Sequence, residues 1–144
     1  MIWKTPLTIE ELQKRCANTF VSHLKIVFTE VGDDYLKAEM PIGPYLMQPM
    51  GIMHGGVSCS LAETVGSAAA NYCVDIKTEY CVGLDINTNH IRPVTLGVLT
   101  ATAKPYHIGK KTQVWSIEIH DDQNNLVSVT RLTLMILKHN AENT

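Results

Sequence analysis

The chain has 144 residues and a formal net charge of −2 at pH 7; 45% of its residues are hydrophobic and 18% are charged. This length and apolar content predict a single domain over residues 1–144 and exclude a disordered chain. The small net charge gives no reason to expect a nucleic-acid or membrane partner. No segment has the ~20 apolar residues of a membrane span.

The four cysteines form neither a CxxC pair nor a regular framework; they are Cys16, Cys59, Cys73 and Cys81. This pattern is typical of reduced thiols, and the N-terminal segment lacks the apolar run of a secretory signal. We therefore expect a cytoplasmic protein. The histidines show no spacing typical of a metal site, so we expect neither a metal nor a cofactor.

The N-terminal part is expected to contain one helix and two strands. Thr8 and Glu11 have the Thr-x-x-Glu spacing of a capping box, which predicts a helix over residues 9–18. A first strand is expected over residues 24–30. Over residues 35–42 apolar and polar side chains alternate, which predicts a half-buried strand.

A long helix is predicted over residues 55–74. It is apolar around most of its circumference, which is typical of a helix buried in a core. Its polar side chains fall within an arc of about 100° on a helical wheel; they are Ser60, Glu63, Thr64, Ser67 and Asn71. Between Glu39 and Asp75, Glu63 is the only Asp, Glu, Lys or Arg.

Strands alone are predicted after this helix, over residues 82–87, 95–106, 113–119 and 126–137, and then a frayed tail over residues 138–144. Six strands and one long helix predict an α+β fold in which a curved antiparallel sheet wraps around the helix. The outer face of the sheet would need a cover, and self-association is one way to supply it.

Three interpretations of Glu63 are open. It could be an ordinary surface carboxylate, or a buried structural one paired with Arg92 or Arg131. The functional interpretation is a carboxylate with restricted solvent access that acts as general base or nucleophile. Ser60 and Ser67 lie one turn away on the same face, and either could hydrogen-bond it.

The predicted helix begins at a His54-Gly55-Gly56 sequence. The first N–H groups of a helix are free, and the two glycines would leave them open to a ligand. Such donors fit an oxyanion hole that stabilises charge on a carbonyl oxygen, or else a phosphate site. Cys59 as a thiol nucleophile is a weaker alternative, because it lies nearer the apolar side of the helix.

Basic residues gather in two later segments, 89–93 and 104–111. Each segment alone is typical of a solvated loop. Together they predict two adjacent basic edges, which would fit an anionic, phosphate-bearing ligand.

The chain resembles the hotdog-fold acyl-CoA thioesterases of the PaaI/YdiI branch, and among them the 1,4-dihydroxy-2-naphthoyl-CoA hydrolase group. The motif is Gln48-Pro49-x-Gly51-x-x-His54-Gly55-Gly56 followed by Leu61-Ala62-Glu63. The resemblance implies a hotdog fold and hydrolysis of an acyl-CoA thioester, with an aromatic acyl group expected. It also implies a homodimer with shared active sites, which commonly pairs into a homotetramer. The alternative is a non-catalytic acyl-CoA binding or regulatory module of the same fold.

The resemblance also implies roles for individual residues. Glu63 would be the nucleophile or general base, and the Gly55 N–H would polarise the thioester carbonyl. Gln48 and His54 would position the acyl group or the attacking water, and Ser67 would support the reacting end. Contacts to CoA are implied for Val82, Asn89, His90, Ile91, Arg92, His107, Ile108, Gly109, Lys110 and Lys111.

Overall fold

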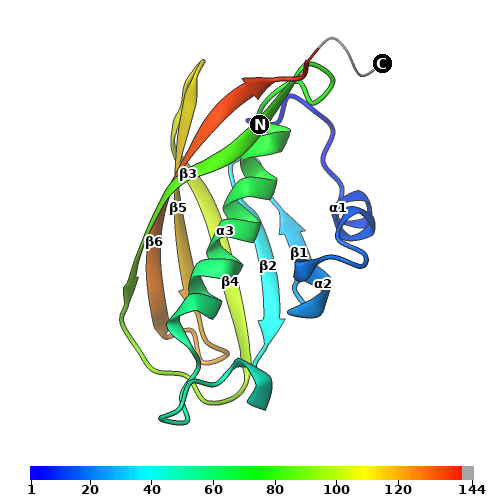
Figure 1. Cartoon of the computed structure of the whole chain (residues 1–144). Helices are drawn as coiled ribbons and strands as arrows, with labels where there is room; N and C mark the ends of the chain where they lie inside the picture. Colours follow the sequence, from blue (N-terminus) through cyan, green and yellow to red (C-terminus); the bar gives the residue numbers. More distant parts are fainter. Residues whose placement is uncertain (141–144) are drawn as a thin grey trace.

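The computed structural model describes residues 1–140. Six strands form one antiparallel sheet in the order β1-β2-β4-β5-β6-β3, and the sheet curls around helix α3 (Gly55–Tyr72), as Figure 1 shows. The strands are β1 (Val27–Val31), β2 (Leu36–Pro41), β3 (Glu79–His90), β4 (Val98–Ile108), β5 (Thr112–His120) and β6 (Leu126–Lys138). The predicted α+β fold, with an antiparallel sheet wrapped around one long helix, is therefore confirmed.

The core lies between α3 and the concave face of the sheet. The inward residues of β2, predicted from its alternation, are fully buried; they are Leu36, Ala38 and Met40. On α3, Gly66 allows a close approach to the sheet, because a Cβ there would lie 2.7 Å from the Leu132 side chain. Small residues on the helix thus set the distance at which the sheet packs.

The N-terminal region departs from the prediction. Helix α1 (Ile9–Arg15) has the predicted cap, with the Glu11 N–H donating to Thr8 Oγ1, but it ends before Asn18, which is left-handed (φ 59°). A second helix, α2 (Phe20–His23), ends just before the predicted first strand, and its C-cap Leu24 and a left-handed Lys25 (φ 58°) occupy the start of that strand. Residues 24–26 are consequently not in a strand, and β1 begins at Val27.

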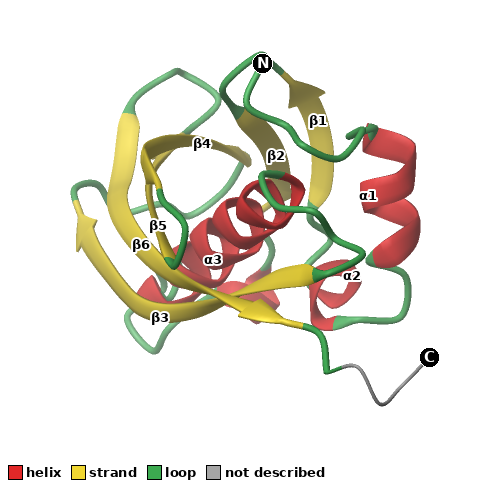
Figure 2. Cartoon of the chain, turned by 90° about the horizontal axis from the view of Figure 1, so that it is seen from above, coloured by secondary structure: helices red, strands yellow, loops and turns green. Residues whose placement is uncertain are grey.

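Helices α1 and α2 lie at the β1 side of the sheet, beside α3 (Figure 2). A short 3-10 helix, η1 (Pro44–Leu46), follows β2 and leads to the loop before α3. Among the described residues, no helix combines the length and the hydropathy needed to cross a bilayer.

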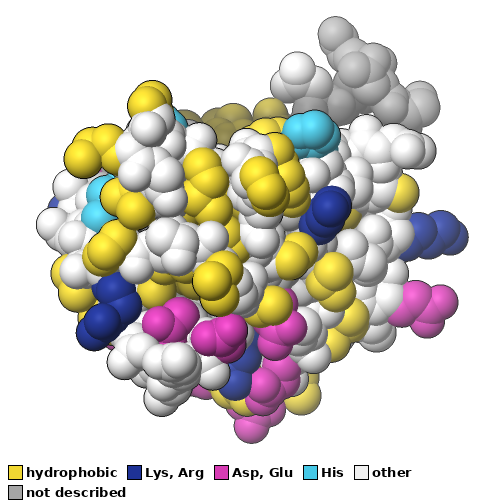
Figure 3. All heavy atoms as spheres, turned by 90° about the horizontal axis from the view of Figure 1, so that it is seen from below, with side chains coloured by type: hydrophobic (Ala, Val, Ile, Leu, Met, Phe, Trp, Pro, Cys, Tyr) yellow, Lys and Arg dark blue, Asp and Glu magenta, His cyan; other side chains and the backbone are white. Residues whose placement is uncertain are grey.

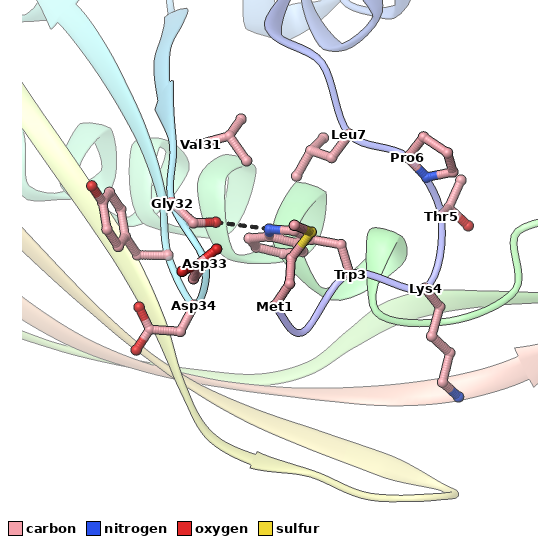
Figure 4. Close-up of a pocket in the computed structure, with 11 residues that line it drawn as sticks. Met1, Trp3, Lys4, Thr5, Pro6, Leu7, Val31, Gly32, Asp33 and Asp34 are labelled. Atoms are coloured by element: carbon pink, nitrogen blue, oxygen red, sulfur yellow. Dashed lines mark hydrogen bonds between the residues drawn. The ribbon is translucent and has the colours of Figure 1, made fainter.

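The N-terminal segment connects the end of α3 to the turn between β1 and β2. The Trp3 indole N–H donates to the Gly32 carbonyl at 2.8 Å, which Figure 4 shows at the wall of a pocket. The Lys4 and Thr5 N–H groups donate to the Tyr72 carbonyl, so they satisfy an acceptor that the C-terminus of α3 leaves free.

Residues 138 and 139, which were predicted as the start of a frayed tail, make ordered contacts. Lys138 belongs to β6, and the His139 N–H donates to the Thr78 carbonyl at 3.0 Å while its ring stacks on Tyr80. The remainder of the predicted tail at residues 141–144 lies outside the described residues.

Candidate active site

The Glu63 carboxylate lies half-buried between α3 and β3. Its Oε1 accepts a hydrogen bond from Ser67 Oγ at 3.1 Å. The same oxygen lies against Gly83 of β3, where an added Cβ would overlap it. Within residues 1–140 no Lys or Arg nitrogen comes within 4.0 Å of it, so the structural interpretation that pairs Glu63 with Arg92 or Arg131 is wrong.

The polar side chains of α3 differ in the groups that they bond. Ser60 and Thr64 donate to carbonyls of their own helix, at 2.9 Å and 2.7 Å. The Asn71 side chain donates to the Cys81 carbonyl and accepts from the Cys81 N–H, and these two bonds hold β3 against the helix. Of the two serines predicted to contact Glu63, only Ser67 does so.

The N-terminus of α3 has one free glycine amide rather than two. His54 is the N-cap, and its Nδ1 accepts from the Gly56 N–H at 2.9 Å. The ring proton of a neutral His54 therefore resides on Nε2. The prediction that Gly56 also offers an open donor is wrong. In the described part of the chain, the Gly55 N–H has no backbone acceptor.

The loop before α3 is a tight turn that places Gln48 beside Gly55. The Gly51 N–H donates to the Gln48 carbonyl at 2.9 Å, and Gly51 has a φ of 81°, which favours glycine. The Gln48 side-chain oxygen accepts from the Met50 N–H. This leaves the side-chain NH₂ of Gln48 available to a ligand.

A cavity of about 460 Å³ opens at this turn. It collects five of the residues implied by the resemblance: Gln48, Gly55, His90, Ile91 and Arg92. The His90 ring lies over Gly55, since a Cβ on that glycine would be 2.8 Å from His90 Nε2. His90 was predicted as a CoA contact, and it also lies at the oxyanion-hole candidate.

Glu63 does not line this cavity. Glu63 is the eighth residue after Gly55 on α3, which corresponds to about 12 Å along the helix axis. The Gly55 N–H and the Glu63 carboxylate of one chain are therefore too far apart to act on the same carbonyl group. We refer to the surroundings of Gly55 and of Glu63 as the two half-sites of the candidate active site.

The implied CoA contacts fall into two groups within one chain. Val82 is seven residues before Asn89 on β3, which corresponds to about 23 Å. Ile108, Gly109, Lys110 and Lys111 lie at the Val82 end of the sheet, where Ile136 of β6 donates to Lys111 O. Arg92 lies at the other end, where its N–H donates to Val127 O. Within one chain Arg92 is therefore remote from Lys110 and Lys111, and the expectation of two adjacent basic edges is wrong for these cations.

Asn89 and His107 line a separate cavity of about 650 Å³, together with Tyr106 and Arg131. Because side chains alternate along a strand, Asn89 points to the outer face of the sheet while His90 points inward. Asn89 and His90 are adjacent in the chain but therefore lie on opposite faces of the sheet.

Gly83 is a site residue that sequence reasoning did not identify. It precedes a β-bulge between Gly83 and Asp85, where β3 has one extra residue relative to β6. The sequence contained a signal for Gly83, because an isolated glycine inside a strand pattern often marks a β-bulge or a close approach of another group to the backbone.

Two of the cysteines remain protonated thiols. Burial raises the pKa of Cys73 to about 12 and that of Cys81 to about 11. Both are buried and free, so they behave as small apolar side chains.

Comparison with known proteins identifies the family. The family model described as Thioesterase superfamily matches residues 50–128. The 1,4-dihydroxy-2-naphthoyl-CoA hydrolase of Escherichia coli (strain K12) is 42% identical over 137 residues, which are 95% of this chain and 100% of that protein. A Vibrio cholerae protein that carries only a provisional esterase name is 49% identical over 135 residues, 94% of this chain and 89% of that protein.

The crystal structure of a thioesterase from Haemophilus influenzae superimposes with a TM-score of 0.94. Its sequence is 44% identical, and the match covers 100% of both chains. Helix, sheet and loop before α3 thus recur in a solved thioesterase. The chain therefore belongs to the thioesterase superfamily and is a hotdog-fold thioester hydrolase.

Proposed function

We propose that the protein hydrolyses acyl-CoA thioesters with an aromatic acyl group to the free acid and CoA. Glu63 acts as nucleophile or general base, and the Gly55 N–H polarises the thioester carbonyl. One observation carries the proposal: Glu63 is half-buried, oriented by Ser67, and free of any cation within 4.0 Å in the described chain. Such a carboxylate remains available to attack or to deprotonate water.

The aromatic acyl group is supported by the relative in Escherichia coli, whose name states a naphthoyl-CoA substrate. His54 Nε2–H and the free Gln48 NH₂ are donors next to the Gly55 amide. They would position the acyl carbonyl or the attacking water. Arg92 and the loop 107–111 would bind the phosphates of CoA.

The separation of the half-sites supports a homodimer. Strand β3 is an edge strand of 12 residues, and its exposed side chains include Val82 (37%), Leu84 (54%) and Ile86 (37%). A long apolar edge is a template for pairing with another chain. The end of the molecule where α3 begins also carries many exposed hydrophobic side chains (Figure 3), and its loops expose Tyr45, Met50 and Ile91.

The contacts of β3 also favour one register. Gly83 contacts Glu63 and His90 contacts Gly55 in the same chain. The bulge brings Gly83 and His90 to the same inward face of the sheet, although their spacing is odd. Antiparallel pairing about a two-fold axis between Ile86 and Asn87 would place Gly83 opposite the partner's His90.

This register would bring Glu63 of one chain beside the Gly55 amide of the other. It would also bring Arg92 towards the Lys110–Lys111 loop of the other chain, which joins the two groups of implied CoA contacts. Two such dimers would form the proposed homotetramer and cover further exposed surface.

The test is the conversion of Glu63 to Gln. Glu63→Gln keeps the side-chain length and an oxygen that Ser67 can bond, but it removes the base and nucleophile. We expect kcat on benzoyl-CoA to fall by about 10²–10⁴-fold with an unchanged melting temperature. Free CoA is measured by thiol release.

Glu39→Gln provides the matched control, because Glu39 is an exposed carboxylate on the face of β2 that points away from the core. It should retain the wild-type rate. Near-normal turnover by Glu63→Gln would refute the mechanism, and a wild-type protein that hydrolyses no CoA thioester would refute the proposed function.

A further inference from the structure

Another cavity, of about 270 Å³, lies between the N-terminal helices and α3. Leu12, Val21 and Phe28 form its apolar wall from the N-terminal side. On the α3 side it is lined by Thr64, Ser67, Ala68, Asn71 and Tyr72. Ser67 is the residue that donates to Glu63, so the cavity begins one side chain away from the proposed catalytic carboxylate.

The cavity is small and mostly apolar. Burial raises the pKa of Cys16, which lines it, so the thiol stays protonated and adds apolar surface. Pockets for drug-sized ligands measure ~300–1,000 Å³, so this volume fits a short or ring-sized group.

One cation also lines the cavity. The Arg15 guanidinium donates to the Tyr72 hydroxyl at 3.5 Å. A guanidinium carries several N–H donors, and within residues 1–140 no carboxylate lies within 4.0 Å of Arg15. Arg15 is exposed, so its other donors meet water until a ligand in the cavity offers them an oxygen acceptor.

We infer, on the basis of the proposed thioesterase function, that this cavity holds the acyl group and that Arg15 selects acyl groups with an oxygen substituent. The thioester lies at Glu63, and the acyl group extends past Ser67 between α3 and the N-terminal helices. Its ring packs on Leu12, Val21 and Phe28, and a ring hydroxyl remote from the thioester accepts from Arg15. Arg15 is thus a specificity-determining residue.

The test compares kcat/KM for benzoyl-CoA with those for 3- and 4-hydroxybenzoyl-CoA. We expect the wild type to prefer the better hydroxylated substrate by about tenfold, because the Arg15 guanidinium donates to the added hydroxyl. Arg15→Met keeps the side-chain length and removes the charge. It should lose about tenfold on the hydroxylated substrate and stay within about twofold on benzoyl-CoA.

Lys14→Met is the matched control, since Lys14 is an exposed cation of the same helix that does not line the cavity. It should preserve both rates. Equal losses on both substrates in Arg15→Met, or no preference in the wild type, would overturn the role of Arg15. Absence of hydrolysis of all three substrates by the wild type would instead contradict the thioesterase proposal itself.

A second variant tests the cavity independently of charge. Val21→Phe fills the cavity from the α2 side. It should lower kcat/KM for benzoyl-CoA by about tenfold or more and leave acetyl-CoA within about twofold, because the acetyl group does not reach Val21. Unchanged benzoyl-CoA kinetics in a folded Val21→Phe protein would place the acyl group elsewhere.

Discussion

Glu63 and Gly83 illustrate what a single residue contributes to this site. Glu63 belongs to the buried helix α3, and its carboxylate lies against β3. The residue of β3 at that point must be glycine, because a Cβ at Gly83 would overlap the carboxylate. The absence of a side chain on β3 therefore allows the position in which Ser67 orients Glu63. The isolation of Glu63 is visible in the sequence, whereas the need for Gly83 depends on which strand lies next to it.

We expect Gly83→Ala to displace the Glu63 carboxylate and to lower kcat by about 10²-fold, since small misplacements of a reacting group are costly. The fold should persist, because strands tolerate alanine at least as well as glycine. Steady-state kinetics and thermal melting measure the two effects.

A double-mutant cycle separates this explanation from a general disturbance of β3. If Gly83 acts through the carboxylate, adding Gly83→Ala to Glu63→Gln should cause little further loss. Fully additive losses would indicate an independent role for Gly83.

At the scale of elements, the N-terminal segment stabilises the end of α3. Trp3 bonds the turn after β1, and the next two residues donate to the Tyr72 carbonyl. The N-terminal segment thereby connects the turn after β1 with the C-terminal end of α3. None of these contacts has a periodicity or a motif, so none was predicted.

We expect Trp3→Phe to lower the free energy of unfolding by about 1–2 kcal/mol, because it removes the bond to Gly32 and some buried ring area. Urea denaturation measures this. Thr5→Ser, which retains a hydroxyl to donate to the Val74 carbonyl, is the mild control. An unchanged denaturation midpoint in Trp3→Phe would show that the indole does not anchor the segment.

The differences around residues 16–26 also belong to this scale. The helix and strand patterns there are each reasonable locally, but Asn18 and Lys25 adopt left-handed conformations and allow an extra turn of helix. Asn adopts the left-handed conformation more readily than other non-glycine residues, so Asn18 is a local signal for the end of α1, whereas no local pattern predicts this conformation for Lys25.

For the whole molecule, the proposed dimer makes a prediction of its own. Glu63→Gln damages one half-site and Gln48→Ala damages the other. If each active site combines halves from two chains, a heterodimer of the two variants contains one site with both lesions and one intact site. Refolding an equal mixture should then restore about a quarter of the wild-type activity, because half of the dimers are heterodimers.

The control is each variant refolded alone. Activity of the mixture equal to the average of the two variants would show that both halves of the site come from the same chain. Size-exclusion chromatography of each sample establishes that dimers have formed.

The sequence by itself determined the α+β class, the long buried helix, its N-cap region and the isolated carboxylate. These features depend on periodicity, capping and charge within one segment, which are local properties. Only the tertiary structure decided that Glu63 meets Gly83, that His90 covers Gly55 and that Arg15 borders a cavity beside Ser67. Those contacts join residues far apart in the chain, and their geometry follows from strand register and from the bulge in β3, which no local pattern specifies.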